Sequence, residues 1–322
     1  VVISEKSQKV KIKKQANQFS VKETFTIDKP QLWSPENPYL YQVITQLKDA
    51  KTGVVYDESV ESLGFRWFHF DSEKGFFLNG ENLKLIGTNR HQDFLKKGNA
   101  LSDEMHVSDV LLLKEMGGNF LRISHYPQDP VVLETCDRLG ILASVEIPIV
   151  NAITESKDFT ENSLFMAEEM VKQNFNHPSL IIWAYMNEVL LRPPFNEKTE
   201  KERYTLYANN IAKLASEIEQ KIRVLDPSRY TMIANHGAIT RYKNAGLTAI
   251  PMLLGWNLYQ GWYGGTFSGF DKCLDELHNL FPNKPLIITE YGADVHHRLH
   301  SFDSERFDYT VEYGNRYHEH YL

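Results

Sequence analysis

The sequence predicts an α/β fold, in which a small β-sandwich precedes a (β/α)8 barrel that lacks its eighth strand. Residues 1 to about 68 alternate apolar and polar side chains in short runs separated by turn residues, which is typical of a sandwich. After about residue 70, strand-like and helix-like segments alternate, which indicates a parallel sheet with crossover helices. We therefore expect two domains, residues 1–68 and residues 69–322.

The first domain contains three runs that we expect to be strands. They cover residues 19–27, 39–47 and 54–61, and Pro30 and Pro35 separate the first run from the second. Three strands are few for a complete sandwich, so we expect that a strand is missing at its start.

In the second domain the strand-like runs are rich in apolar residues, as strands buried on both faces are. The first helix illustrates how the ends of the helices are recognised, because Ser102 is a typical N-cap and Gly117 ends the apolar periodicity. We expect strands near residues 83–91, 119–126, 141–149, 180–188, 230–236, 252–260 and 286–292, and helices near residues 102–117, 130–140, 163–175, 197–225, 269–281 and 304–320.

Seven strands do not close a (β/α)8 barrel, because the seventh and the first would each have to pair with an eighth. The last residues, 317–322, continue a helical pattern, and the first residues resemble mid-chain sequence. We therefore interpret the chain as a fragment. Its cellular location stays open between the cytoplasm and the periplasm or exterior, because a leader could have been removed with an upstream segment.

Composition excludes several classes of protein. The net charge of −7, without a basic block, argues against a nucleic-acid partner. No apolar run approaches the roughly 20 residues that a membrane span needs. Cys136 and Cys273 lie far apart in expected helices, which gives neither a disulfide framework nor a metal-binding spacing. We interpret both as thiols of the core.

Two strand-like runs end in a carboxylate, at Glu188 and at Glu290. The carboxyl ends of parallel barrel strands share one face, and active sites lie on that face. Two carboxylates that face one another across a pocket are the minimum equipment for cleaving a glycosidic bond. The alternative is two solvated charges that form salt bridges at the strand ends.

Several short motifs occur in a fixed order along the chain. They are residues 32–41, 64–66, 87–93, 121–127, 176–179, 187–188 and 289–292. In that order they resemble glycoside hydrolase family 2, which includes β-galactosidases, β-glucuronidases and β-mannosidases. The resemblance covers nearly the whole chain, and it implies an immunoglobulin-like β-sandwich followed by a catalytic TIM barrel.

The resemblance implies that Glu188 is the general acid/base and Glu290 the nucleophile of a retaining mechanism. It also implies that Arg122 and Tyr259 support the ionised nucleophile and that Asn187 binds the sugar 2-hydroxyl. Physical reasoning agrees with this division, because an acid that holds its proton near neutral pH needs a raised pKa and a nucleophile must stay ionised.

Further residues of the pocket follow from the same resemblance. His91, His125 and Asp93 resemble residues that line the sugar pocket. Trp262 and Tyr263 either form an aromatic platform beside the site or pack a loop, and the sequence leaves both open.

We expect no metal and no cofactor. His296, His297 and His300 cluster after the last strand, but they lack the His-Glu-x-x-His pattern, so a surface loop is the better interpretation. Residues 146–151 also lack the Glu and His pair that holds magnesium in some family members.

These observations favour an exo-acting β-glycosidase whose partner is a carbohydrate. The sequence of residues 89–93 and 124–127 favours a β-galactosidase, whereas residues 257–263 and 287–294 also resemble β-glucuronidases. In that subfamily the residues that bind the glucuronate carboxylate lie beyond the eighth strand, so the sequence leaves the sugar open. An inactive carbohydrate-binding fragment is a further alternative, and a homo-oligomer stays open.

Overall fold

A seven-stranded parallel sheet organises the protein, in a computed structural model that describes residues 1–11 and 20–321. Neighbouring strands are neighbours in sequence throughout, which confirms the predicted barrel architecture. Within the described residues the first and last strands of this sheet do not pair with each other. The strands are β6 (Gly87–Arg90), β7 (Phe120–Ile123), β8 (Leu142–Glu146), β9 (Leu180–Asn187), β10 (Tyr230–His236), β11 (Leu253–Asn257) and β12 (Leu286–Glu290).

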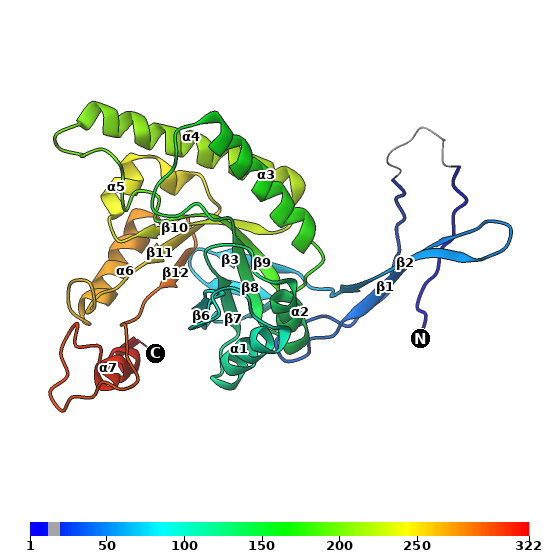
Figure 1. Cartoon of the computed structure of the whole chain (residues 1–322), viewed down its shortest axis with the longest axis horizontal. Coiled ribbons are helices and arrows are strands. Elements are labelled where there is room, and N and C mark those ends of the chain that lie inside the picture. Colours follow the sequence, from blue (N-terminus) through cyan, green and yellow to red (C-terminus); the bar gives the residue numbers. More distant parts are fainter. Residues whose placement is uncertain (12–19, 322) are drawn as a thin grey trace.

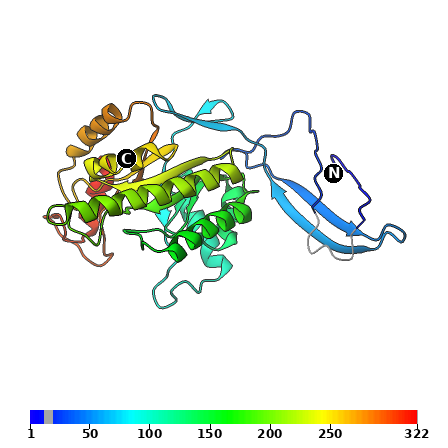
Figure 2. The ribbon, with the colours of Figure 1, turned by 90° about the horizontal axis from the view of Figure 1, so that it is seen from above.

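The helices lie on the outside of this sheet, as Figures 1 and 2 show. Every residue of β7, β8 and β9 is buried, because the helices cover one face of these strands and the barrel interior covers the other. The helices are α1 (Asp103–Glu115), α2 (Pro130–Leu139), α3 (Lys157–Asn174), α4 (Lys201–Leu225), α5 (Ile239–Asn244), α6 (Gly269–Leu280) and α7 (Val311–Tyr321), with a 3-10 turn η1 (Leu247–Ala249).

Capping decides where the predicted helices begin. Helix α3 begins six residues earlier than predicted, because the Ser156 hydroxyl accepts a hydrogen bond from the Phe159 amide at 3.1 Å. Helix α7 begins later than predicted, after Thr310, whose hydroxyl accepts from the Tyr313 amide at 3.2 Å. The short segments α5 and η1 were not predicted, since each is too short to show an apolar period.

A small antiparallel sheet closes the amino-terminal end of the barrel, and it was not predicted. It consists of β3 (Phe68–Asp71), β4 (Gly75–Leu78) and β5 (Glu81–Asn82). The predicted strand at 83–91 is too long, because β6 covers only Gly87–Arg90 and residues 83–86 form no strand. Phe76 and Leu78 of β4 pack with residues that begin the barrel strands, such as Phe120 and Leu142.

Three of the sequence motifs meet beneath the barrel. The Trp33 indole donates to the carbonyl of Asp137 at 2.8 Å, and its side chain is fully buried. The Arg66 guanidinium donates to the carbonyls of Pro178 and Leu180 at 2.9 and 3.1 Å. These contacts join the amino-terminal part of the chain to the barrel, at the end opposite to the strand exits.

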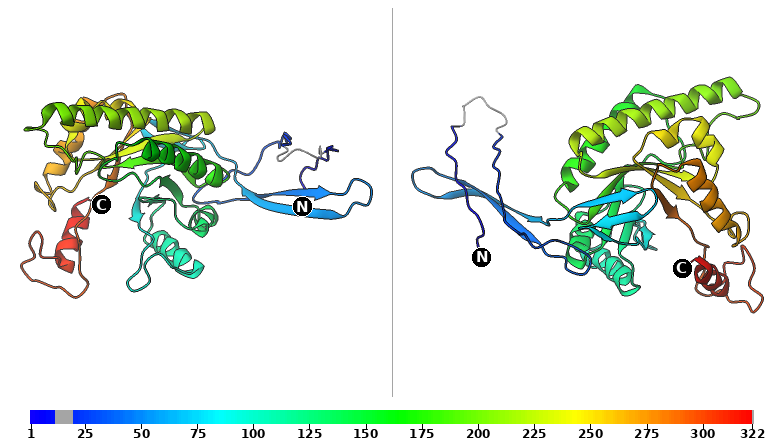
Figure 3. Two further views of the ribbon diagram at one scale, coloured as in Figure 1. Left: turned by 45° about the horizontal axis from the view of Figure 1, so that its top comes forward. Right: turned by 180° about the vertical axis from the view of Figure 1, so that it is seen from behind.

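The amino-terminal part contains the hairpin β1 (Tyr41–Lys48) and β2 (Val55–Leu63). Figures 1 and 3 show that it projects away from the barrel. Both strands match predicted runs within two residues, but residues 20–27 of the first predicted run form no strand, and Phe19 lies outside the described residues. An alternating pattern becomes a strand only where its backbone finds a partner, and residues 20–27 have no ladder partner among the described residues.

Within the described residues, no helix has both the length and the apolar character needed to cross a membrane.

Substitution of Gly64 tests the junction. A Cβ at this buried position would lie 2.7 Å from two side-chain atoms of Pro178 and 3.1 Å from Trp33. Because the neighbours are part of the packed junction, we expect Gly64→Ala to lower the free energy of unfolding by about 1–3 kcal/mol, measured by urea denaturation. Gly264→Ala is the matched control, since a Cβ there meets nothing within 4 Å. Equal stability of the two variants would contradict the packing at Gly64.

Candidate active site

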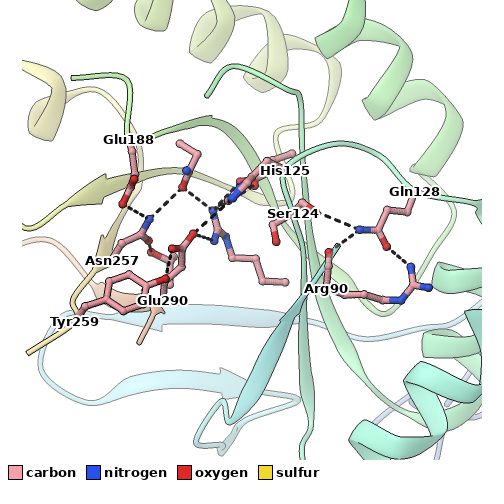
Figure 4. Close-up of polar contacts among 12 residues, drawn as sticks. Arg90, Ser124, His125, Gln128, Glu188, Asn257, Tyr259 and Glu290 are labelled. Atoms are coloured by element: carbon pink, nitrogen blue, oxygen red, sulfur yellow. Dashed lines mark hydrogen bonds and ion pairs between the residues drawn. The ribbon is translucent and has the colours of Figure 1, made fainter. Parts of the chain in front are cut away.

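Glu188 and Glu290 both lie where a barrel strand ends, and each lies beside an irregularity in strand pairing. The register shifts between Met232 and Ala234 of β10 and between Trp256 and Asn257 of β11, next to the two glutamates. Glu188 has a φ of 51°, and its amide donates to the carbonyl of Ala234 at 2.8 Å. Bulges of this kind re-aim side chains, and here both carboxylates point to one region (Figure 4).

The Glu290 carboxylate is held by one cation and one hydroxyl. Arg122 Nη1 donates to one carboxylate oxygen at 2.7 Å, and the Tyr259 hydroxyl donates to the other at 2.6 Å. Burial, followed by the charge of Glu290, raises the pKa of Tyr259, so its hydroxyl keeps the proton that it donates. The structure thus brings together three of the residues predicted from sequence.

Arg122 lies almost fully buried, at 3% side-chain exposure, and contacts more than Glu290. Its Nη2 donates to Asn187 Oδ1 at 3.0 Å and to both oxygens of Glu146 at 3.2 Å. Burial alone would lower the pKa of Arg122, but the charges of Glu146 and Glu290 outweigh burial and raise it. The guanidinium is therefore permanently charged between two carboxylates.

Glu146 is a third carboxylate of this cluster, and sequence analysis did not assign it to the site. Its side chain is 1% exposed, and its Oε1 lies 2.5 Å from His125 Nδ1. Burial would raise the pKa of Glu146, but Arg122 and His125 outweigh burial and hold it below its ordinary value. The available signal was that Glu146 ends an apolar strand-like run, as Glu290 does.

Glu188 has a different environment. It is half-buried, and Asn257 Nδ2 donates a hydrogen bond to its Oε1 at 2.9 Å. Burial and the charge of Glu290 raise the pKa of Glu188, whereas the hydrogen bond from Asn257 lowers it. Together these effects leave the pKa of Glu188 above its ordinary value. Glu188 therefore holds its proton to a higher pH than an ordinary glutamate does.

Asn257 and Asn187 complete the polar cluster. Asn257 Nδ2 also donates to Asn187 Oδ1 at 3.2 Å, and Asn257 Oδ1 accepts from the Thr289 hydroxyl at 2.6 Å. All three side chains are buried. Asn257 and Thr289 were not predicted as site residues. The order of β9, β10 and β11 brings Asn257 beside Glu188, and the pairing of β11 with β12 brings Thr289 beside Asn257.

The predicted histidines lie at the edge of the cluster. His125 Nε2 lies 3.7 Å from Glu290 Oε1, and the ring of His91 meets that of His125 edge-on at 5.0 Å between centroids. Gln128 Nε2 donates to the carbonyls of Arg90 and Ser124, which joins the ends of β6 and β7 beside these rings (Figure 4). Asp93 is exposed two residues beyond His91.

The structure favours the packing alternative for Trp262. Its side chain is 1% exposed, and its ring packs against Phe307 and Tyr313 at centroid distances of 4.9 and 5.7 Å. Tyr263 is 66% exposed and meets the ring of Tyr259 at 5.0 Å. Tyr263, rather than Trp262, is therefore the exposed aromatic side chain next to Tyr259.

Residues 1–11 and 20–321 contain no group of three or more His, Cys, Asp or Glu side chains arranged to hold a metal ion. Of the three histidines that follow β12, His300 pairs with Glu312 at 2.7 Å in an exposed position.

Two family models cover the chain. The model for the TIM barrel domain of glycosyl hydrolases family 2 matches residues 71–322, and a second model for glycosyl hydrolases family 2 matches residues 1–66. The chain belongs to glycosyl hydrolase family 2. This membership agrees with the resemblance seen in the sequence motifs.

Curated relatives of this family 2 chain carry two activities in their names. A β-glucuronidase of Bacteroides fragilis is 35% identical over 285 residues, which is 85% of this chain and 38% of the relative. A β-galactosidase of Thermoanaerobacterium thermosulfurigenes is 31% identical over 283 residues, which is 86% of this chain and 33% of the relative. The chain thus spans about a third of the length of these two relatives.

A solved structure of a Bacteroides uniformis β-glucuronidase is similar to the family 2 chain, with a TM-score of 0.88 and 46% sequence identity. The match covers 91% of this chain and 35% of that one. A structure described as a putative β-galactosidase from Bacteroides fragilis gives a TM-score of 0.79 and 32% identity, and covers 92% of this chain and 42% of that one.

The buried position of Glu146 predicts a pH-dependent contribution to stability. We expect Glu146→Gln to lower the free energy of unfolding by about 3 kcal/mol at pH 7, because it leaves Arg122 and His125 without their buried partner. The folded pKa of Glu146 is depressed, so its contribution is complete above the ordinary value of 4.5 and disappears as pH falls through the folded value. The difference between wild type and variant should therefore shrink below pH 4.5.

Urea denaturation at pH 7 and at acidic pH measures this difference. Glu161→Gln is the control, because Glu161 forms an exposed pair with Lys157 and should contribute well under about 1 kcal/mol. A stability difference for Glu146→Gln that stays constant with pH would contradict the assignment.

Proposed function

We propose that this chain carries the reaction centre of a retaining exo-β-glycosidase, and that its sugar is a terminal β-D-glucuronide. The observation that carries the proposal is the unequal support of the two carboxylates. Arg122 and Tyr259 both donate to Glu290, whereas half-buried Glu188 accepts a side-chain hydrogen bond from the neutral amide of Asn257. This asymmetry supports one carboxylate that attacks and one that carries a proton.

In the first step Glu290 attacks the anomeric carbon while Glu188 gives its proton to the glycosidic oxygen. The bond to the leaving group breaks, the aglycone departs as an alcohol, and an ester joins the sugar to Glu290. In the second step Glu188, now ionised, takes a proton from a water molecule whose oxygen attacks the same carbon. The ester breaks, and both carboxyl groups return to their initial states.

Asn187 is suited to bind a sugar hydroxyl. Its Oδ1 accepts from Arg122 and from Asn257, so the Nδ2 group is the part of the amide that faces a ligand as a donor. A donor fixed in this way beside the reacting carbon is worth most where charge develops in the transition state. This supports the predicted contact with the 2-hydroxyl.

The choice of sugar rests on the comparisons. The sequence motifs favoured a galactoside first, with a glucuronide as the alternative. The relatives from Formosa agariphila and Bacteroides fragilis, at 33% and 35% identity, are named a putative β-glucuronidase and a β-glucuronidase. The Bacteroides uniformis structure at 46% identity is a β-glucuronidase as well. We therefore place the glucuronide first and the galactoside second.

A panel of nitrophenyl β-glycosides (glucuronide, galactoside, mannoside and glucoside) tests this proposal. We expect the glucuronide to have the highest kcat/KM, and Glu290→Gln to lower it by at least roughly 10³-fold, because no ester can form without the nucleophile. The panel is run on this chain and on the longest natural form of the protein, with Glu161→Gln as the control. Sugar binding without hydrolysis in every form would support the binding-fragment alternative instead.

Azide distinguishes the roles of the two carboxylates. In Glu188→Ala the nitrophenolate leaves without protonation, so the ester forms. Azide, an anion that needs no general base, can then attack the anomeric carbon in place of water and release the Glu290 carboxylate. We expect faster turnover with azide and a β-glycosyl azide as product. In Glu290→Ala azide would instead attack the opposite face of the substrate and yield the α-glycosyl azide. Product configuration is read by NMR, and the reverse pattern would exchange the two roles.

A further inference from the structure

A chain of side-chain hydrogen bonds joins the two carboxylates. It begins at Glu290, which Arg122 contacts at 2.7 Å, and continues from Arg122 to Asn187 at 3.0 Å. Asn257 then donates to Asn187 at 3.2 Å and to Glu188 at 2.9 Å. Asn257 is therefore the last residue of this chain of bonds before Glu188. It lies in β11, a strand that contributes none of the other residues of the chain of bonds.

The chemistry of the partners fixes the orientation of both amides. Arginine only donates hydrogen bonds, so the Asn187 group that faces Arg122 has to be the oxygen. The Asn257 group that faces this same oxygen has to be its nitrogen. The Asn257 oxygen then faces the Thr289 hydroxyl, which donates to it at 2.6 Å. The relative exposures of Asn187, Asn257 and Thr289 are 4%, 2% and 5%, so little water competes for these bonds.

We propose that Asn257 is the positioning residue of Glu188, and that the Thr289 hydroxyl acts through Asn257 by holding its amide with the nitrogen toward Glu188. The inference rests on the proposed function, in which Glu188 has to act first as an acid and then as a base. A neutral amide donor suits both roles, because it orients the carboxylate and favours its ionised form less than a cation would.

The position of Thr289 links the placement of Glu188 to that of Glu290. Thr289 directly precedes Glu290 in β12, and it is the residue at which the pairing with β11 shifts from Trp256–Ile288 to Asn257–Glu290. The strand that carries the nucleophile therefore also holds the amide that orients the acid/base. Correct placement of one carboxylate then depends on the same strand register as correct placement of the other.

Other charged and titratable groups around Glu188 are retained when Thr289 is changed. They are Glu290 in β12, Arg122 in β7, His125 in the loop after β7, Tyr242 in α5, and Tyr259 and Tyr263 in the loop after β11.

Thr289→Val tests the proposal, because it removes the hydroxyl and nearly keeps the shape, and Thr289→Ser is the matched control that keeps the hydroxyl. In Thr289→Val the amide of Asn257 keeps its contact with Asn187 Oδ1 but loses the hydroxyl that holds its oxygen, so its hydrogen bond to Glu188 weakens. We expect the basic limb of the kcat/KM profile to move up by about half a pH unit and the second step to slow several-fold. Thr289→Ser should stay close to wild type in both.

Two results would overturn the inference. One is a Thr289→Val profile that coincides with that of wild type, and the other is a Thr289→Ser profile shifted as far as that of Thr289→Val. Asn257→Asp provides a second variant that does not depend on how Val is accommodated. It keeps the shape but replaces the donor nitrogen with an acceptor oxygen, so we expect a larger shift in the same direction.

A measurement without substrate separates this inference from the proposed function. The pH titration of the Glu188 carboxyl carbon, observed by ¹³C NMR of glutamate-labelled protein and assigned with Glu188→Gln, gives its pKa directly. We expect a higher pKa in Thr289→Val than in wild type or Thr289→Ser. If this shift occurs but no glycoside is cleaved, the proposed function fails and the positioning role stands. If glycosides are cleaved but the shift is absent, the positioning role fails alone.

Discussion

The polar cluster depends on Arg122 more than on any other residue. Its guanidinium faces Glu290 on one side and Glu146 on the other, with 3% of its side chain exposed. Two ionised carboxylates could not remain in so buried a place without a cation between them, because an isolated buried charge is strongly disfavoured. The planar fork of the guanidinium contacts several acceptors at fixed angles, which a lysine ammonium cannot do. The same group thus places a cation beside the proposed nucleophile and orients its carboxylate.

Much of the fold and part of the site could be predicted from the sequence. Long apolar runs determined the barrel strands, and glutamates at the ends of two of these runs marked Glu188 and Glu290. The pairing of Arg122 and Tyr259 with Glu290 followed from the motifs and is present in the structure. These features are local, or are tied to local motifs, and a sequence records them directly.

The rest depends on which strands become neighbours. Asn257 faces Glu188 only because β10 pairs with β9 on one side and with β11 on the other, and no local pattern contains that information. Whether an aromatic side chain is exposed or packed also depends on contacts with residues distant in sequence. Trp262 and Tyr263 are adjacent in sequence, but they are 1% and 66% exposed. The sheet β3–β5 escaped prediction because its strands are only two to four residues long.

Packing contacts close one end of the barrel, and the two carboxylates lie at the other. This separation affects how such a chain can change during evolution. Trp33, Arg66 and β4 close the amino-terminal end, whereas Glu188 and Glu290 lie at the strand exits on the opposite end. Loops at the exits can therefore accumulate mutations without weakening the packing that keeps the barrel folded. A lineage built in this way can exchange one sugar for another while keeping its scaffold, which fits a set of relatives that carry both β-glucuronidase and β-galactosidase names.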